Sequence, residues 1–139
     1  MRRAAVIGAL ALLLGGCGGS DRPPPKQTDK EVIGGWIAAL NAGDYVAAAS
    51  YFAKDAVVEQ SEEFRLRTRE AAEEFNRSLP CTANLTDVKD EGKTTLAAFR
   101  LRAGPGGPCH GRARVRFTIR HGKFTEWRQL PEPEPGPVA

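Results

Sequence analysis

The chain has 139 residues, of which 41% are hydrophobic, 27% charged and 7% aromatic. This length supports one hydrophobic core, so two independent domains are not expected. The formal net charge is +3, but Arg2 and Arg3 lie in a segment that we predict to be removed. The mature side chains then carry 18 Lys and Arg against 17 Asp and Glu, an excess too small to argue for a nucleic-acid partner, and none is expected.

The first sixteen residues have the pattern of a signal peptide. Two arginines precede an apolar run over 4–14, and small residues follow the run up to Cys17. A permanent transmembrane helix needs about 20 apolar residues, so this run is too short and is expected to be cleaved.

Residues 14–17, Leu-Gly-Gly-Cys, resemble the lipobox of bacterial lipoproteins. The resemblance implies cleavage before Cys17 and acylation of its thiol. The protein is then expected in the bacterial cell envelope, bound to a membrane through lipid, with its domain on the extracytoplasmic side. An ordinary secretory signal with a chance cysteine stays as the alternative.

Both ends of the mature chain have the composition of unfolded segments. Residues 17–27 comprise the acylated cysteine and a tether with three consecutive prolines, and at about 3.1 Å per residue this tether reaches roughly 30 Å from the lipid. Residues 131–139 alternate Pro with Glu or Gly, which predicts a disordered tail. The folded domain is therefore expected over 28–130.

Three helices are predicted in the first half of this domain. The first begins at an N-cap, Thr28 or Asp29, and its apolar face is Val32, Ile33, Trp36, Ile37 and Leu40. The adjacent Gly34 and Gly35 weaken it by about 1 kcal/mol each relative to Ala, so we expect them to admit a close neighbour. The second helix is predicted over 45–53 and the third over 68–79, where Pro80 ends it.

Strands are predicted to follow. A short β-prone segment covers 56–59, and from Cys81 onward the hydrophobic period is two, with strands over 94–102, 112–120 and 123–130. A Gly/Pro loop over 104–108 and a two-residue turn at His121-Gly122 connect the last three strands. The order predicts an α+β fold, with three N-terminal helices packed on one face of a curved, mostly antiparallel sheet.

Three segments, 36–44, 51–58 and 117–127, carry a resemblance to the nuclear transport factor 2-like superfamily, also called SnoaL-like. The resemblance implies a cone-like, cystatin-like roll with a pocket. The superfamily includes ketosteroid isomerase, polyketide cyclases and non-catalytic binding modules, so the fold alone does not decide the function.

The resemblance also places the isomerase's catalytic positions on this chain. The oxyanion-donating tyrosine corresponds to Trp36, the general-base aspartate to Gln60, and the second acid to about Arg114. All three residues differ from the isomerase pattern. Proton transfer by a carboxylate beside a stabilised enolate is therefore not expected.

Cys81 and Cys109 lie 28 positions apart in an exported chain, which predicts a disulfide between them. A redox pair is the alternative, although there is no C-x-x-C spacing. The two histidines, His110 and His121, lack metal-ligand spacing, and no metal or other cofactor is expected.

Two groups of residues are candidates for binding. The candidate pocket residues are Trp36, Tyr51, Asp55, Glu59, Gln60, Phe99, Phe117 and Trp127. The alternative is that the aromatic ones form only the core. The candidate basic face, which requires two strands to pair, is Arg100, Arg102, Arg112, Arg114, Arg116 and Arg120. It would suit anionic lipid, a cell-wall polymer or an acidic partner, or it is a solvated face neutralised by nearby carboxylates.

Three functions stay open on the sequence. The first is a non-catalytic envelope lipoprotein that binds a small apolar ligand or a partner protein in its cone. The second is an isomerase or hydrolase that uses Glu59 or Asp55, and the third is an interaction module that uses the basic face. Too few aromatic residues are interleaved with the arginines for single-stranded nucleic acid. The sequence does not fix the oligomeric state, and a dimer is compatible with it.

Overall fold

The computed structural model describes residues 25–131, and all its helices and strands lie between Asp29 and Leu130. The predicted signal peptide over 1–16, the lipidation site at Cys17, most of the tether and the tail after Pro131 lie outside the described residues. None of the described helices is long and apolar enough to cross a membrane.

The three helices are α1 (Asp29–Asn41), α2 (Tyr45–Ala49) and α3 (Arg69–Ser78). Each begins where a side-chain oxygen accepts a backbone N–H: the capping residues are Thr28, Asp44 and Thr68. The second helix is shorter than predicted. It ends at Ala49 because the backbone from Phe52 onward already pairs with a neighbouring strand.

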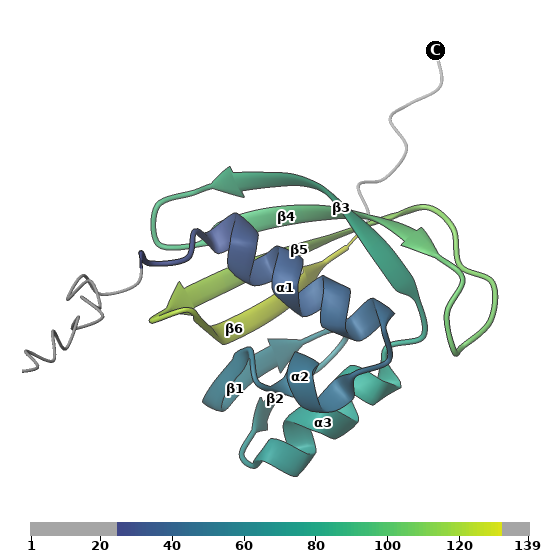
Figure 1. The fold of residues 1–139 in the computed structure, drawn as a ribbon, viewed down its shortest axis with the longest axis horizontal. Coiled ribbons are helices and arrows are strands. Elements are labelled where there is room, and N and C mark those ends of the chain that lie inside the picture. Colours follow the sequence, from purple (N-terminus) through teal and green to yellow (C-terminus); the bar gives the residue numbers. More distant parts are fainter. Residues whose placement is uncertain (1–24, 132–139) are drawn as a thin grey trace, which may run out of the picture.

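The strands are β1 (Phe52–Glu59), β2 (Glu63–Leu66), β3 (Thr82–Asp90), β4 (Thr95–Arg102), β5 (Arg112–Arg120) and β6 (Lys123–Leu130). They form one sheet in the order β2-β1-β6-β5-β4-β3, in which only β1 and β6 run parallel. The helices cover one face of this curved sheet (Figure 1). The predicted α+β fold class is confirmed.

Trp36 of α1 stands at the centre of the core. The centroid of its ring lies 5.8–6.3 Å from the centroids of five other aromatic rings. Each of these pairs is edge-to-face, an arrangement that aromatic pairs favour. These five rings belong to Phe52, Phe99, Phe117, Phe124 and Trp127. All five residues of the apolar face predicted for α1 are buried, so this helix packs against the inner face of the sheet as expected.

Candidate functional site

A cavity of about 290 Å³ lies between α1 and the inner face of the sheet. We call it the apolar cavity. Its floor is aromatic, formed by Trp36, Phe99 and Trp127, and aliphatic side chains from α1, β4 and β5 form its walls. Among the described residues, none that lines it has an ionisable side chain, because Cys81 is in a disulfide.

The exposed residues Gln60, Pro80 and Gln129 mark the opening of the apolar cavity. The two amides meet there, with Gln60 Nε2 3.4 Å from Gln129 Oε1. The indole Nε1 of Trp127 is buried without an acceptor among the described residues, and it is closed to solvent, so it does not open into the cavity. The cavity therefore offers apolar walls and an amide pair at its entrance.

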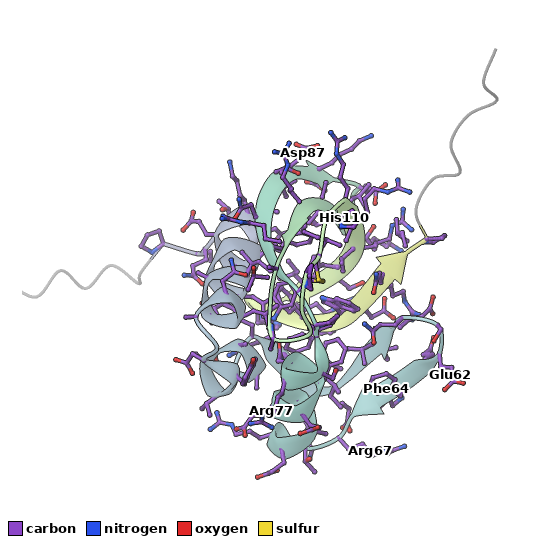
Figure 2. All side chains as sticks on the ribbon, turned by 90° about the vertical axis from the view of Figure 1, so that its right-hand side faces the viewer. Glu62, Phe64, Arg67, Arg77, Asp87 and His110 are labelled. Carbon is purple, nitrogen blue, oxygen red and sulfur yellow. A yellow bond between two sulfur atoms is a disulfide. The ribbon has the colours of Figure 1, made fainter. Side chains whose placement is uncertain are left out.

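The predicted disulfide is present at this entrance, because Cys81 lines the cavity and bonds to Cys109 with a Cα–Cα distance of 5.9 Å. Cys109 belongs to the β4–β5 loop, 103–111. This loop is also held against Pro80, whose carbonyl accepts a hydrogen bond of 2.9 Å from Gly106 N. Figure 2 looks onto this end of the molecule, with the loop that carries His110 in front.

The predicted pocket residues separate into two groups. Trp36, Gln60, Phe99 and Trp127 line the apolar cavity. The other aromatic candidates do not. Phe117 is fully buried in the core, and Tyr51 stacks on Phe124 with a centroid distance of 6.3 Å.

The placement of the two carboxylates inside the cone was wrong. Glu59 faces the opposite side of the sheet, where its carboxylate accepts a 2.6 Å hydrogen bond from Arg128. Asp55 is exposed, with a φ of 61°, at an irregular stretch in the pairing of β1 with β6. Val58 and Gln60 take the inward positions, so alternation along the strand turns Glu59 outward.

On this outer face, Arg128 also bonds Glu63 at 2.8 Å and Glu126 at 3.1 Å. Hydrogen bonds from Arg128 and from the Thr118 hydroxyl hold the pKa of Glu126 below its usual value. Glu63 and Glu126 in turn raise the pKa of Arg128. The cluster spans β1, β2 and β6. It engages Glu59, one of the two carboxylates considered in the enzyme interpretation, in an ion pair with Arg128.

The predicted basic face requires β4 and β5 to pair, and they do, with Arg100 opposite Arg112. Two of its six arginines are engaged. Arg116 forms a 3.0 Å ion pair with Glu91, which lowers the pKa of that carboxyl, and Arg114 donates to the Pro131 carbonyl at 3.3 Å. In the described part of the chain, Arg100, Arg102, Arg112 and Arg120 form no ion pair.

The family model described as a SnoaL-like domain matches residues 33–127. The chain belongs to the SnoaL-like family. Among curated proteins, none matches it by sequence.

Solved structures show the same fold at low sequence identity. An NTF2-like protein from Cytophaga hutchinsonii superposes with a TM-score of 0.62 at 13% identity, over 78% of this chain and 93% of its own. A proposed polyketide cyclase from Sinorhizobium meliloti superposes with a TM-score of 0.58 at 20% identity, over 71% of this chain and 93% of its own. A proposed ketosteroid isomerase from Kribbella flavida superposes with a TM-score of 0.57 at 19% identity, over 77% of this chain and 81% of its own.

The three positions that the sequence resemblance matched to isomerase catalytic residues can be placed in this SnoaL-like domain. The Trp36 Nε1 donates to the Asn76 Oδ1 at 2.8 Å, so its donor is already engaged. Gln60 lies at the cavity entrance. Arg114 is on the outer face of β5, whereas its neighbours Ala113 and Val115 line the cavity. A residue at position 114 therefore cannot reach a ligand in the cavity.

Two residues of this SnoaL-like domain, Asn76 and Gln129, were not predicted from the sequence. Asn76 is fully buried on α3 and donates its amide to the Ala72 carbonyl at 2.8 Å. A polar residue beside Phe75 on the apolar face of that helix was the available signal. Gln129 shares the inward face of β6 with Trp127, two positions earlier, so strand alternation alone points to it.

Proposed function

We propose that this protein is a non-catalytic, lipid-anchored protein of the bacterial envelope, and that its SnoaL-like domain binds a small, mainly apolar molecule. The observation that carries the proposal is the apolar cavity, which no ionisable side chain lines within the described residues. Binding sites of this kind are concave and mostly apolar, with a few polar groups that fix orientation.

The size of the cavity limits the ligand. Small-molecule sites typically enclose about 300–1,000 Å³, and this cavity, at about 290 Å³, lies at the lower limit. It suits a single ring system or one end of a longer molecule. The aromatic floor of Trp36, Phe99 and Trp127 favours a flat or apolar group.

The amide pair at the entrance supports a polar group on the ligand. Gln60 and Gln129 lie at the opening of the cavity, with Gln60 Nε2 3.4 Å from Gln129 Oε1. Together they provide both donors and acceptors for one polar group of a mainly apolar molecule.

The enzyme alternative has less support. A general acid or base must lie within hydrogen-bond reach of the substrate, and the two carboxylates considered for this role, Asp55 and Glu59, do not line the cavity. The membrane anchor in the proposal rests on the lipobox pattern at residues 14–17.

The test is native mass spectrometry of the mature lipoprotein, purified in detergent from its own envelope, with the extracted small molecules identified. We expect a bound molecule in the wild type. In Ala113→Phe a phenyl ring fills the cavity, so this molecule should be lost. The matched control is Ala98→Phe, which places the same ring on the outer face opposite Arg114 and should retain the molecule.

Both variants must first melt cooperatively, which shows that each is folded. Equal retention of the molecule by both variants would contradict binding in the cavity. An empty wild type that also takes up nothing from an extract of its own envelope would contradict the proposed function.

A further inference from the structure

A second hollow, of about 420 Å³, lies at the other end of the sheet from the entrance of the apolar cavity. It is enclosed by α2, the start of β1, the end of β2 and the start of α3. Its floor is apolar and includes Phe52, Leu66 and Ala72. Four cationic residues line it, Lys54, Arg67, Arg69 and Lys123, and no carboxylate does so among the described residues. We call it the basic groove.

The cationic residues of the basic groove are not neutralised locally. None of the four forms an ion pair with a described carboxylate. Lys123 Nζ donates to the Ser50 carbonyl, and the side chains of Lys54, Arg67 and Arg69 are exposed. Figure 2 shows Arg67 pointing away from the body of the domain at its lower edge. The groove therefore concentrates positive charge over an apolar floor.

Two of these cations also lie where they disfavour the local fold. Arg67 and Arg69 flank Thr68, the N-cap of α3, and the dipole of a helix makes positive charge unfavourable at its N-terminus. Glu70, in the first turn of α3, offsets part of this repulsion. A bound anion would remove this repulsion. Arginine is also well suited to phosphate, because its planar guanidinium forms paired hydrogen bonds with two oxygens.

The combination of a cationic rim and an apolar floor selects one type of ligand. A free inorganic ion would use only the rim, and an apolar molecule would use only the floor. An anionic phospholipid would use both, because its phosphate would meet the cations and its glycerol and first methylene groups would lie over the exposed parts of Phe52 and Ala53.

The position of the groove relative to the N-terminus supports a membrane lipid. Lys26 and Gln27 share a hollow with His121 and Gly122, and the next residue, Lys123, lines the basic groove. In Figure 1 the start of α1, the β5–β6 turn and the start of β1 all lie toward the left, and the β4–β5 loop lies toward the right. The described part of the chain therefore begins at the end of the domain that carries the groove.

We propose that the basic groove binds the headgroup of an anionic phospholipid in the membrane that holds Cys17. This contact would orient the domain with the entrance of the apolar cavity directed away from the bilayer. The proposal uses the lipid anchor of the proposed function for proximity, but it does not depend on any ligand in the apolar cavity.

The test measures vesicle binding without the acyl anchor. The mature chain from residue 17 is prepared with Cys17→Ser and sedimented with phosphatidylcholine vesicles that contain or lack phosphatidylglycerol. The groove variant is Lys54→Gln/Arg67→Gln/Arg69→Gln. The control variant, Arg100→Gln/Arg102→Gln/Arg112→Gln, has the same change of charge on the outer face of the sheet.

We expect the wild type to bind only the vesicles with phosphatidylglycerol. Each cation near an anionic surface raises the partition coefficient about fivefold. The partition coefficient of the groove variant, which lacks three cations, should therefore fall on the order of 100-fold. The control variant should keep its binding to within a fewfold. Equal losses in the two variants would show attraction by net charge alone and overturn the proposal, as would a wild type that ignores phosphatidylglycerol.

A second measurement separates a lipid from a free phosphate. Glycerol 3-phosphate is titrated while backbone amide shifts around Thr68 are followed by NMR. Weak binding of glycerol 3-phosphate together with tight binding of vesicles supports the proposal. Tight binding of glycerol 3-phosphate without binding of vesicles would show that the groove takes a free phosphate and not a membrane lipid, which overturns the proposal. Removing Arg69 relieves repulsion at α3, so the groove variant should melt at or above the wild-type temperature, which excludes unfolding as the cause of a loss.

The headgroup proposal and the proposed function can be overturned independently of each other. If the mature lipoprotein retains its small molecule and the groove variant still binds vesicles normally, only the headgroup proposal is overturned. If no small molecule is ever found but vesicle binding is lost in the groove variant, only the proposed function fails.

Discussion

Trp36 shows how a single residue can organise the core of the domain. Its indole contacts five aromatic rings, and its N–H donates to Asn76, whose side chain is fully buried. Asn76 in turn donates to the Ala72 carbonyl. The hydrogen bonds fix the orientation of the indole, and this ring then forms part of the floor of the apolar cavity.

We predict that Asn76→Ala lowers the free energy of unfolding by about 2–4 kcal/mol, because it leaves the indole N–H without an acceptor and opens a small void. Urea denaturation measures this loss. The control is Asn84→Ala on β3, which removes an exposed amide and should change stability by less than about 0.5 kcal/mol. If the two variants lose the same stability, the Trp36–Asn76 hydrogen bond is not what holds the indole.

At the scale of the helix, α1 contains two neighbouring glycines with opposite surroundings. A methyl group at Gly34 would meet no other atom within 4 Å, whereas one at Gly35 would collide with the hydroxyl end of Tyr51. Tyr51 cannot retreat easily because its ring stacks on Phe124. Gly35 is therefore needed for packing, and Gly34 only weakens the helix.

These surroundings predict opposite effects of the same substitution. Gly34→Ala should raise the free energy of unfolding by about 0.5–1 kcal/mol, since alanine restricts the unfolded chain and favours the helix. Gly35→Ala should lower it by about 1–3 kcal/mol, since the tyrosine ring and its neighbours must shift. Thermal or urea unfolding of the two variants measures both effects. A gain in stability in both variants would contradict the prediction, because it would show that Tyr51 moves freely.

The elements also show which features a sequence can predict. The apolar face of α1 and the alternation in β5 are local patterns, and the structure confirms both. The orientation of β1 is not local. Ala56, Val57 and Val58 are all buried, so no alternation shows which side faces the cavity, and Glu59 was assigned to the wrong face. The short strand β2 has a single buried residue, Leu66, and therefore left no hydrophobic pattern.

Over the whole molecule, the two ends of the sheet have different chemistry. One end holds the entrance of the apolar cavity and the β4–β5 loop, and the other holds the basic groove near the first described residues. The sequence predicted the disulfide from cysteine number and spacing. It did not predict the groove, because Lys54, Arg67 and Lys123 converge only after β1, β2 and β6 have assembled.

The disulfide ties the β4–β5 loop, through Cys109, to Cys81 at the cavity entrance, so its removal tests how this loop is held. In the chain-entropy description, a link between residues 28 positions apart contributes about 3.5 kcal/mol. We expect Cys81→Ala/Cys109→Ala to lower the free energy of unfolding by about this amount, as measured by urea denaturation.

A second contact competes with the disulfide for this role. The backbone at Gly104 and Gly106 packs directly on Pro80, with no room for a side chain at either position, and Gly106 N donates to the Pro80 carbonyl at 2.9 Å. If the disulfide holds the loop, amide hydrogen exchange over 103–111 should accelerate in the double variant while exchange in β5 changes only with global stability. If instead the loop keeps its protection and stability falls by less than about 1 kcal/mol, the glycine contact alone holds it. Gly106→Ala would then be the substitution that releases the loop from the cavity entrance.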